Sequence, residues 1–189
     1  MKVELLHVTP NALETIGRYA GICYGSSTDS DACIRRAINC KEKGHLATLR
    51  FAHATFHISG ISRVCSHQFV RSKHLDFLQR SQRYCKEDEA QFVYPGTDSD
   101  TLISGAYQSA MAKYQELLAL GVKKEDARFV LPEGTQTELV VTGNLQAWLD
   151  FVKLRADKHA QWEIRRVAKI INNHLASECN GLFNWMPME

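Results

Sequence analysis

The chain has 189 residues, a length that fits one folded domain with a hydrophobic core. Its 44% hydrophobic and 23% charged residues are typical of a globular protein, and a formal net charge of +2 gives no general attraction to nucleic acid. No apolar run approaches the roughly 20 residues that span a bilayer, and the N-terminus lacks the apolar segment of a signal peptide. We therefore expect a cytoplasmic protein with neither a nucleic-acid nor a membrane partner, in which Arg and Lys bind anions only where they cluster.

The cysteines show no pattern of a metal site or a redox motif. They are Cys23, Cys33, Cys40, Cys65, Cys85 and Cys179. No two of them form a Cys-x-x-Cys pair, and their spacing matches no zinc site. Free thiols and no metal are expected.

The first half of the chain alternates apolar and polar residues in a way that predicts both strands and helices. In chain order we expect a strand over Val3–Val8, helices over Asn11–Tyr19 and Asp29–Lys43, a strand over Leu49–Ile58 that ends before Gly60, and a helix over Ile61–Lys73. These helices carry apolar residues at helical spacing, which predicts one buried face for each of them.

The second half follows a loop over Tyr94–Asp100 and is more regular. We expect a long amphipathic helix over Thr101–Leu120, a short helix over Lys124–Val130, a strand over Thr137–Thr142, and helices over Leu145–Arg155 and Ala160–Ala176. The chain contains no repeat and no linker-like tract. The pattern therefore predicts a single α/β (α+β) domain over residues 1–189, with a sheet packed against long helices.

A first polar segment combines groups that bind phosphate. Arg71 and Ser72 follow Gln68 by three and four positions, and so share a face of the expected helix with it. Ser81 and Arg83 alternate on a segment that we expect to be extended, which would point both side chains the same way. A hydroxyl and a guanidinium side by side suit a phosphate. The alternative interpretation is a solvated basic helix followed by a polar loop.

A second polar segment runs over Arg155–Glu163. Arg155 and His159 are i, i+4 neighbours, and Asp157 is the expected N-cap of the final helix. The alternative is an ordinary junction between two helices with an ion pair. Glu125 and Arg128 are likewise expected to form an exposed ion pair on the short helix.

These segments together resemble the flavin-dependent thymidylate synthase family over roughly residues 30–178. The matching residues, in chain order, are Gly44-His45, Arg71-Ser72-Lys73 followed after seven residues by Ser81-Gln82-Arg83-Tyr84, then Gly121-Val122, Glu125, Ala127-Arg128, Val130-Leu131-Pro132 and Leu154–Ile164. The last of these segments matches the family's late motif with almost no change, and it is the most specific part of the resemblance.

The resemblance implies a fold, an assembly and a reaction. The fold is an α/β (α+β) domain whose antiparallel or mixed sheet packs against long helices. Four copies form a homotetramer with active sites between subunits. The reaction methylates dUMP at C5 to give dTMP in nucleotide biosynthesis, with methylenetetrahydrofolate as the carbon donor, FAD as the cofactor and NADPH as the reductant.

The resemblance also assigns roles to individual residues. The nucleotide would contact Gln68, Arg71, Gln79, Ser81, Arg83, Arg128 and Arg155. Among these, Arg155 and Ser81 are the expected catalytic residues. Arg155 would place a fixed cation beside the pyrimidine, which stabilises negative charge as C5 becomes nucleophilic. FAD and folate would contact His45, Arg71, Ser72, Lys73, Asn144, Asp150 and His159.

The chain departs from the family pattern mainly on the flavin side. Ser72 replaces the family's His, and Lys73 replaces its second Arg, so a stacking ring and a planar fork are lost. Gln79 stands where Glu is usual, and Asp150 stands where the family has an amide. Ala47–Phe51 replaces a run that contains a carboxylate and an imidazole. The chain therefore retains more of the family's nucleotide-binding residues than of its flavin-binding residues.

Three functions remain open at this point. The first is dTMP synthesis with an altered mode of flavin binding. The second is flavin- and folate-dependent hydroxymethylation of dUMP or dCMP, which the altered triplet motivates together with Gln79, whose neutral amide can present a donor or an acceptor to a pyrimidine edge. The third is a nucleotide-binding homologue without catalysis.

Overall fold

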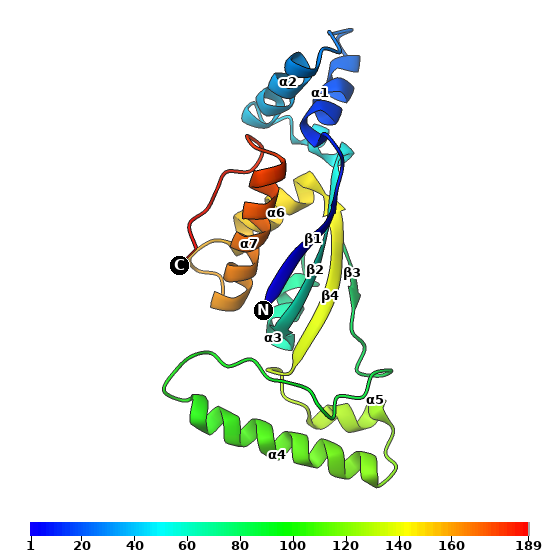
Figure 1. The fold of residues 1–189 in the computed structure, drawn as a ribbon, viewed down its shortest axis with the longest axis vertical. Coiled ribbons are helices and arrows are strands. Elements are labelled where there is room, and N and C mark those ends of the chain that lie inside the picture. Colours follow the sequence, from blue (N-terminus) through cyan, green and yellow to red (C-terminus); the bar gives the residue numbers. More distant parts are fainter. Residues whose placement is uncertain (189) are drawn as a thin grey trace.

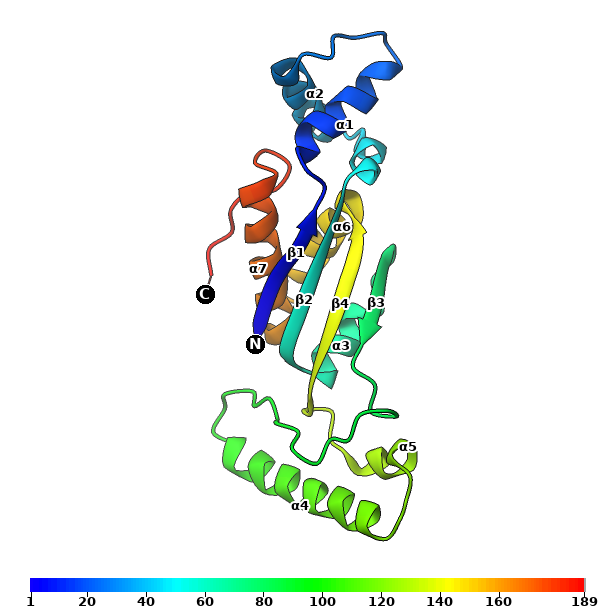
Figure 2. The same ribbon diagram turned by 45° about the vertical axis from the view of Figure 1, so that its right-hand side comes forward.

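A computed structural model describes residues 1–188, which form a four-stranded antiparallel sheet with helices on one face and at both ends (Figures 1 and 2). The strands are β1 (Lys2–Val8), β2 (His53–Ser62), β3 (Leu75–Gln79) and β4 (Gln136–Asn144), in the spatial order β1-β2-β4-β3. The helices are α1 (Ala12–Ile22), α2 (Ser30–Glu42), α3 (Arg63–Phe69), α4 (Asp100–Ala119), α5 (Lys124–Ala127), α6 (Leu145–Arg155) and α7 (Trp162–Glu178), with 3-10 turns η1 (Leu46–Phe51) and η2 (Arg128–Val130). All three strand pairs are antiparallel, so the expected α+β fold is confirmed.

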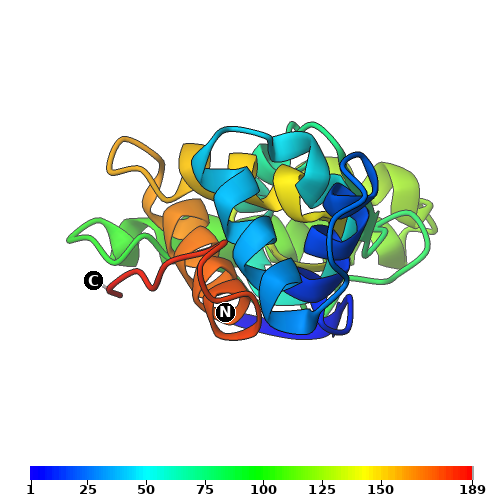
Figure 3. The same ribbon diagram turned by 90° about the horizontal axis from the view of Figure 1, so that it is seen from above.

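The molecule is elongated along the strands. The pair α1 and α2 lies at one end of the sheet, α4 and α5 lie at the other, and α3, α6 and α7 cover one face between them (Figures 1 and 2). Seen from above, α1 and α2 lie in front of the rest of the molecule (Figure 3). The sheet therefore has one covered face, and its other face carries polar side chains such as His57 and Glu138.

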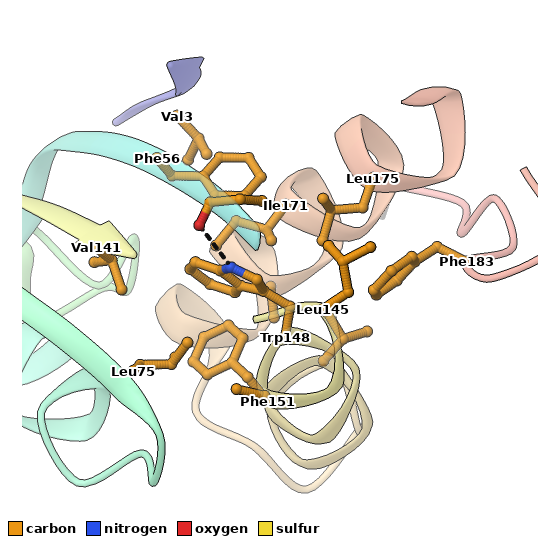
Figure 4. Packing of buried hydrophobic residues seen from close by; sticks show 14 of the residues in the cluster. Val3, Phe56, Leu75, Val141, Leu145, Trp148, Phe151, Ile171, Leu175 and Phe183 are labelled. Carbon is orange, nitrogen blue, oxygen red and sulfur yellow. Dashed lines mark hydrogen bonds between the residues drawn. The ribbon is translucent and has the colours of Figure 1, made fainter. Parts of the chain in front are cut away.

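The core lies between the covered face of the sheet and helices α6 and α7. Strand β4 alternates strictly between buried and half-buried residues, as expected when only one face is covered. Trp148 of α6 is completely buried, its ring meets that of Phe56 edge-on at 5.0 Å, and its Nε1 donates to the Ala54 carbonyl at 3.0 Å (Figure 4). A buried indole N–H needs such a partner, so Trp148 joins the helix layer to the sheet by both packing and a hydrogen bond.

Strand β2 differs from the prediction at both of its ends. Leu46–Phe51 is a 3-10 turn, and the strand begins only at His53. It then continues past Gly60, where we expected it to end. Gly60 has φ +67, a conformation that suits glycine, and the pairing with β4 shifts register there as in a β-bulge. The glycine bends the strand and carries it on to Ser62.

Helix α3 is shorter than predicted, and the strand that follows it was missed. The helix ends at Phe69, and a turn follows in which His74 has φ +61. Leu75–Gln79 then pairs with β4 as an edge strand. The predicted extended segment after it was also wrong, because the Cys85 N–H donates to the Ser81 carbonyl at 2.8 Å in a tight turn.

Helix α4 stands away from the core, and Tyr114 is its only buried residue. Within the described part of the chain, no helix combines the length and the apolar character needed to cross a membrane.

The cysteines are free, as expected. Burial raises the pKa of the Cys65 thiol, and it raises that of Cys179 to about 12. Because the thiolate is the reactive form, we expect iodoacetamide at pH 8 to label exposed Cys23 in the native protein and to leave Cys65 and Cys179 unmodified. Mass spectrometry of tryptic peptides checks this, with urea-unfolded protein as the control in which all three react. Rapid native labelling of Cys65 would contradict the described core.

Candidate functional site

Helix α3 carries Gln68, one of the predicted site residues, and its two ends are fixed by side chains of the segment that joins α6 to α7. Its N-terminus is capped by Ser62, whose Oγ accepts from the Cys65 N–H at 3.0 Å. The carboxylate of Glu163, only 1% exposed, accepts in turn from the Ser62 N–H at 2.8 Å and from the Ser62 hydroxyl. A buried carboxylate with two donors fixes the start of α3 against α7.

The first group of predicted residues lies at the other end of α3. Arg155 at the end of α6 donates from Nη2 to the Gln68 carbonyl at 3.0 Å, and the Gln68 amide lies 3.5 Å from the side-chain oxygen of Gln161. The Arg155 Nε is buried and has no hydrogen-bond partner within residues 1–188. The structure thus brings Gln68 and Arg155 together, 87 positions apart in the chain, and leaves part of the guanidinium uncommitted.

The cap of the final helix differs from the prediction. Gln161, not Asp157, caps α7, because its side-chain oxygen accepts from the N–H groups of Glu163 and Ile164 at 3.0 and 3.2 Å. The Asp157 carboxylate instead accepts from the His159 N–H at 2.8 Å inside the turn that joins α6 to α7.

The second group of predicted residues surrounds α5. The Arg83 Nε lies 2.7 Å from the carboxylate of Glu125, and the Arg128 Nε donates to the Glu125 carbonyl at 3.0 Å. The Lys124 ammonium donates to the Tyr84 carbonyl at 2.7 Å. The expected ion pair between Glu125 and Arg128 is therefore wrong, since Arg83 takes the carboxylate. Ser81 begins the turn that holds Arg83, and its Oγ accepts from the Arg83 N–H at 3.3 Å.

A surface pocket of about 340 Å³ adjoins this second group. It is lined by Arg63, His67, Gln82, Arg128, Phe129, Leu131, Pro132 and Glu133. Burial lowers the pKa of Arg63, whose Nη2 donates to the Arg80 carbonyl at 2.9 Å and whose Nε is buried without a partner in the described residues. Two guanidiniums beside the exposed ring of Phe129 suit a ligand that is both anionic and planar.

Gln79 lies under α3, on the covered side of the sheet. Its Nε2 donates to the Ser66 hydroxyl at 2.9 Å and to the Thr137 hydroxyl at 3.3 Å. The amide nitrogen is thus committed inside the protein.

The residues that the resemblance assigned to the cofactor gather near the end of β4. The turn with Arg71, Ser72 and Lys73 follows α3, and the His74 carbonyl packs so closely on Gly143 that an added Cβ there would lie 3.1 Å from it. Asn144, the next residue, caps α6 by accepting from the Ala147 N–H, so its side-chain oxygen has a structural role. The Ser72 Oγ is buried and has no partner in the described part of the chain.

Three further predicted cofactor residues are exposed. His45 precedes η1, which contacts α6 through a 2.9 Å hydrogen bond from Arg50 to Gln146. Asp150 lies on the outer face of α6, and His159 lies in the turn after it. The structure does not bring these three side chains into contact with one another.

Several residues that shape the site were not predicted from the sequence. Glu163 lies inside the late motif, so the motif offered a signal for it. No sequence signal marked Ser62, Arg63 or Glu87 as residues that fix α3 and the turn at Ser81.

Comparison with known proteins gives concordant matches. The profile of the family described as "Thymidylate synthase complementing protein" matches residues 4–179. The chain is 36% identical to a flavin-dependent thymidylate synthase of Mycobacteroides abscessus, across 92% of this chain and 78% of that protein. It is 40% identical to a flavin-dependent thymidylate synthase of Mycobacterium sp. (strain JLS), across 67% and 59% of the two chains, and 39% identical to one of Mycobacterium avium, across 74% and 64%. These two alignments span less than two thirds of the relatives' own length.

Proposed function

The chain belongs to the flavin-dependent thymidylate synthase family, and we propose that it transfers a one-carbon unit from methylenetetrahydrofolate to C5 of dUMP, giving dTMP with NADPH as reductant. The observation that carries this proposal is the contact of Arg155 with Gln68, two residues with assigned nucleotide roles that meet at one end of α3.

Arg155 is the proposed catalytic cation. Its Nη2 is held by the Gln68 carbonyl, while its Nε lacks a partner among residues 1–188. A guanidinium held in this way keeps its position as the pyrimidine arrives, and its positive charge stabilises the negative charge that develops on the ring as C5 becomes nucleophilic. Ser81 and Arg83 are the proposed ligands of the phosphate, because a hydroxyl and a guanidinium in one turn supply both kinds of donor.

A site shared between subunits is consistent with how these residues are distributed. Gln68 and Arg155 lie at the end of α3, whereas Arg83 and Arg128 are bonded to Glu125 of α5, and no hydrogen bond or ion pair between described residues joins the two groups directly. We propose that a second subunit of a homotetramer brings the complementary group to each nucleotide.

FAD is the proposed cofactor, and the turn after α3 fits its charge. Arg71 and Lys73 offer cations for a pyrophosphate, and the unpartnered hydroxyl of Ser72 offers a donor. His45, Asp150 and His159 would contact the flavin or the folate, together with the end of β4 at Asn144. FAD, when bound, supplies the redox and carbon-transfer chemistry, while the protein supplies binding and orientation.

The double change Ser72→His with Lys73→Arg is expected to tighten FAD binding by about tenfold, because it restores a stacking ring and a planar fork. Flavin fluorescence titration of the purified apoprotein measures the effect. Lys153→Arg, an exposed lysine on α6, is the matched control and should leave the affinity unchanged. Weaker binding in the double variant, with an unchanged melting temperature, would mean that the flavin lies in a different pose.

A second candidate function is flavin- and folate-dependent hydroxymethylation of dUMP or dCMP. Gln79 favours the dCMP form of this function, since its amide nitrogen is held by Ser66 and Thr137 and its oxygen remains as an acceptor for the amino group of cytosine, which uracil lacks. A third candidate function is that of a nucleotide-binding homologue without catalysis, because the chain lacks several of the family's flavin-side groups.

One preparation separates these functions. The purified protein is examined by absorption spectroscopy with and without added FAD, and the mass of the product formed from dUMP or dCMP is measured by mass spectrometry. If dUMP gives dTMP and dCMP does not react, the result supports the proposal. A product heavier than the methylated nucleotide by one oxygen atom supports hydroxymethylation. A protein that takes up no flavin even with excess FAD and dUMP would make the non-catalytic homologue the leading function.

A further inference from the structure

Arg80 directly precedes Ser81, and both its backbone and its side chain are bonded to neighbouring segments. Its N–H donates to the Glu138 carbonyl at 3.0 Å, and its own carbonyl accepts from Arg63 at 2.9 Å. Its side chain donates from Nε to the Glu87 carboxylate at 3.2 Å, and Nη1 lies 3.6 Å from the Glu138 carboxylate. The peptide that leads into the turn at Ser81 is therefore fixed from β4, from α3 and from the loop beyond the turn.

Glu87 is the buried member of this arrangement. Its side chain is 5% exposed, and its N–H donates to the hydroxyl of Tyr114, the one buried residue of α4, at 3.1 Å. The negative charge of Glu87 also raises the pKa of the Arg80 guanidinium. A carboxylate so well removed from water is stable only while its cation stays in place.

We propose that Arg80 and Glu87 are a positioning pair, which holds the turn of Ser81 and Arg83 in the shape that receives the phosphate of the nucleotide. The turn itself is short and has few constraints of its own. Its internal bonds run from the N–H groups of Arg83, Tyr84 and Cys85 back to Ser81. Because Ser81 is the acceptor of all three, its position sets the backbone of the turn, while Glu125 and Lys124 of α5 hold the Arg83 side chain and the Tyr84 carbonyl.

Neither Arg80 nor Glu87 touches the ligand in this account. The Arg80 guanidinium is committed to two carboxylates, so it is not available to a phosphate, and its effect passes through the backbone into Ser81. The inference rests on the proposed phosphate-binding role of Ser81 and Arg83.

The test compares dUMP with deoxyuridine, which lacks the phosphate, by calorimetric titration of the full-length flavin-loaded protein. Glu87→Gln is expected to raise the Kd for dUMP about tenfold and to leave the Kd for deoxyuridine unchanged, because only the phosphate depends on the turn. Glu89→Gln, an exposed carboxylate two positions away, is the matched control and should change neither value.

Each outcome has a distinct meaning. Equal losses for dUMP and deoxyuridine, or no loss for either, would overturn the positioning role. If Glu87→Gln does not fold, Tyr114→Phe decides: a selective loss for dUMP supports the pair, and unchanged binding overturns it. A wild-type protein that binds dUMP no more tightly than deoxyuridine would instead overturn the phosphate role of Ser81 and Arg83, and this inference with it.

Discussion

Replacing Arg155 with alanine is expected to lower kcat at least about 100-fold while the protein stays folded, since loss of one preorganised donor to developing charge commonly costs this much. Arg155 sits at the end of α6, where only its Nη2 has a described partner, the Gln68 carbonyl. Initial rates at saturating dUMP measure the effect, and thermal melting with flavin content reports on the fold.

Two variants sharpen this experiment. Lys153→Ala removes an exposed cation from the same last turn of α6 and should retain nearly full activity. Arg155→Lys keeps the charge but loses the planar fork, so we expect it to recover only part of the rate. Turnover that is unchanged in Arg155→Ala would remove this residue from the catalytic role.

Replacing Trp148 with alanine is expected to lower the free energy of unfolding by about 3–5 kcal/mol. Trp148 is fully buried, contacts the rings of Phe56 and Phe151, and donates a hydrogen bond to the Ala54 carbonyl. The alanine leaves a cavity and removes the indole donor from the Ala54 carbonyl, which keeps the Thr142 hydroxyl as a donor at 3.4 Å. Urea unfolding followed by circular dichroism measures the loss.

The controls for this experiment separate packing from hydrogen bonding. Trp148→Phe keeps most of the ring but loses the donor, so a smaller loss of about 1–3 kcal/mol is expected. Trp185→Ala removes a tryptophan that is 72% exposed and should change the stability by less than about 0.5 kcal/mol. A loss below about 1 kcal/mol for Trp148→Ala would argue against the described core.

The longer helices of the fold were predictable because each repeats apolar residues at helical spacing, and the side chains of Asp29, Ser62, Asn144 and Gln161 cap α2, α3, α6 and α7. Leu145–Arg155 was predicted with the bounds that the structure gives. Strand β3 was not predictable in the same way, since its five residues form an edge with one fully buried side chain. The continuation of β2 past Gly60 escaped prediction because glycine favours both a chain break and a bulge.

The candidate site was predictable as a set of motif positions but not as an arrangement. Spacing alone gave no reason for Gln68 to meet Arg155, since the pair is brought together by the packing of α3 on the turn after α6. The expected cap at Asp157 failed for a related reason, because a carboxylate near a helix start can satisfy its own turn instead. The partners Glu163 and Glu87 depend on burial, which a single charged letter in a sequence does not reveal.

Residues of the late motif form hydrogen bonds at both ends of α3, so the length of the motif is constrained by the length of α3. Glu163 holds the start of α3 through Ser62, and Arg155 holds its end through Gln68. Arg155 and Glu163 are eight positions apart, with a tight turn between them, so the distance between their side chains matches the length of α3. An insertion between these two residues would change that distance and break one of the two contacts with α3, whereas an insertion in the exposed loop before α4 would leave both contacts intact.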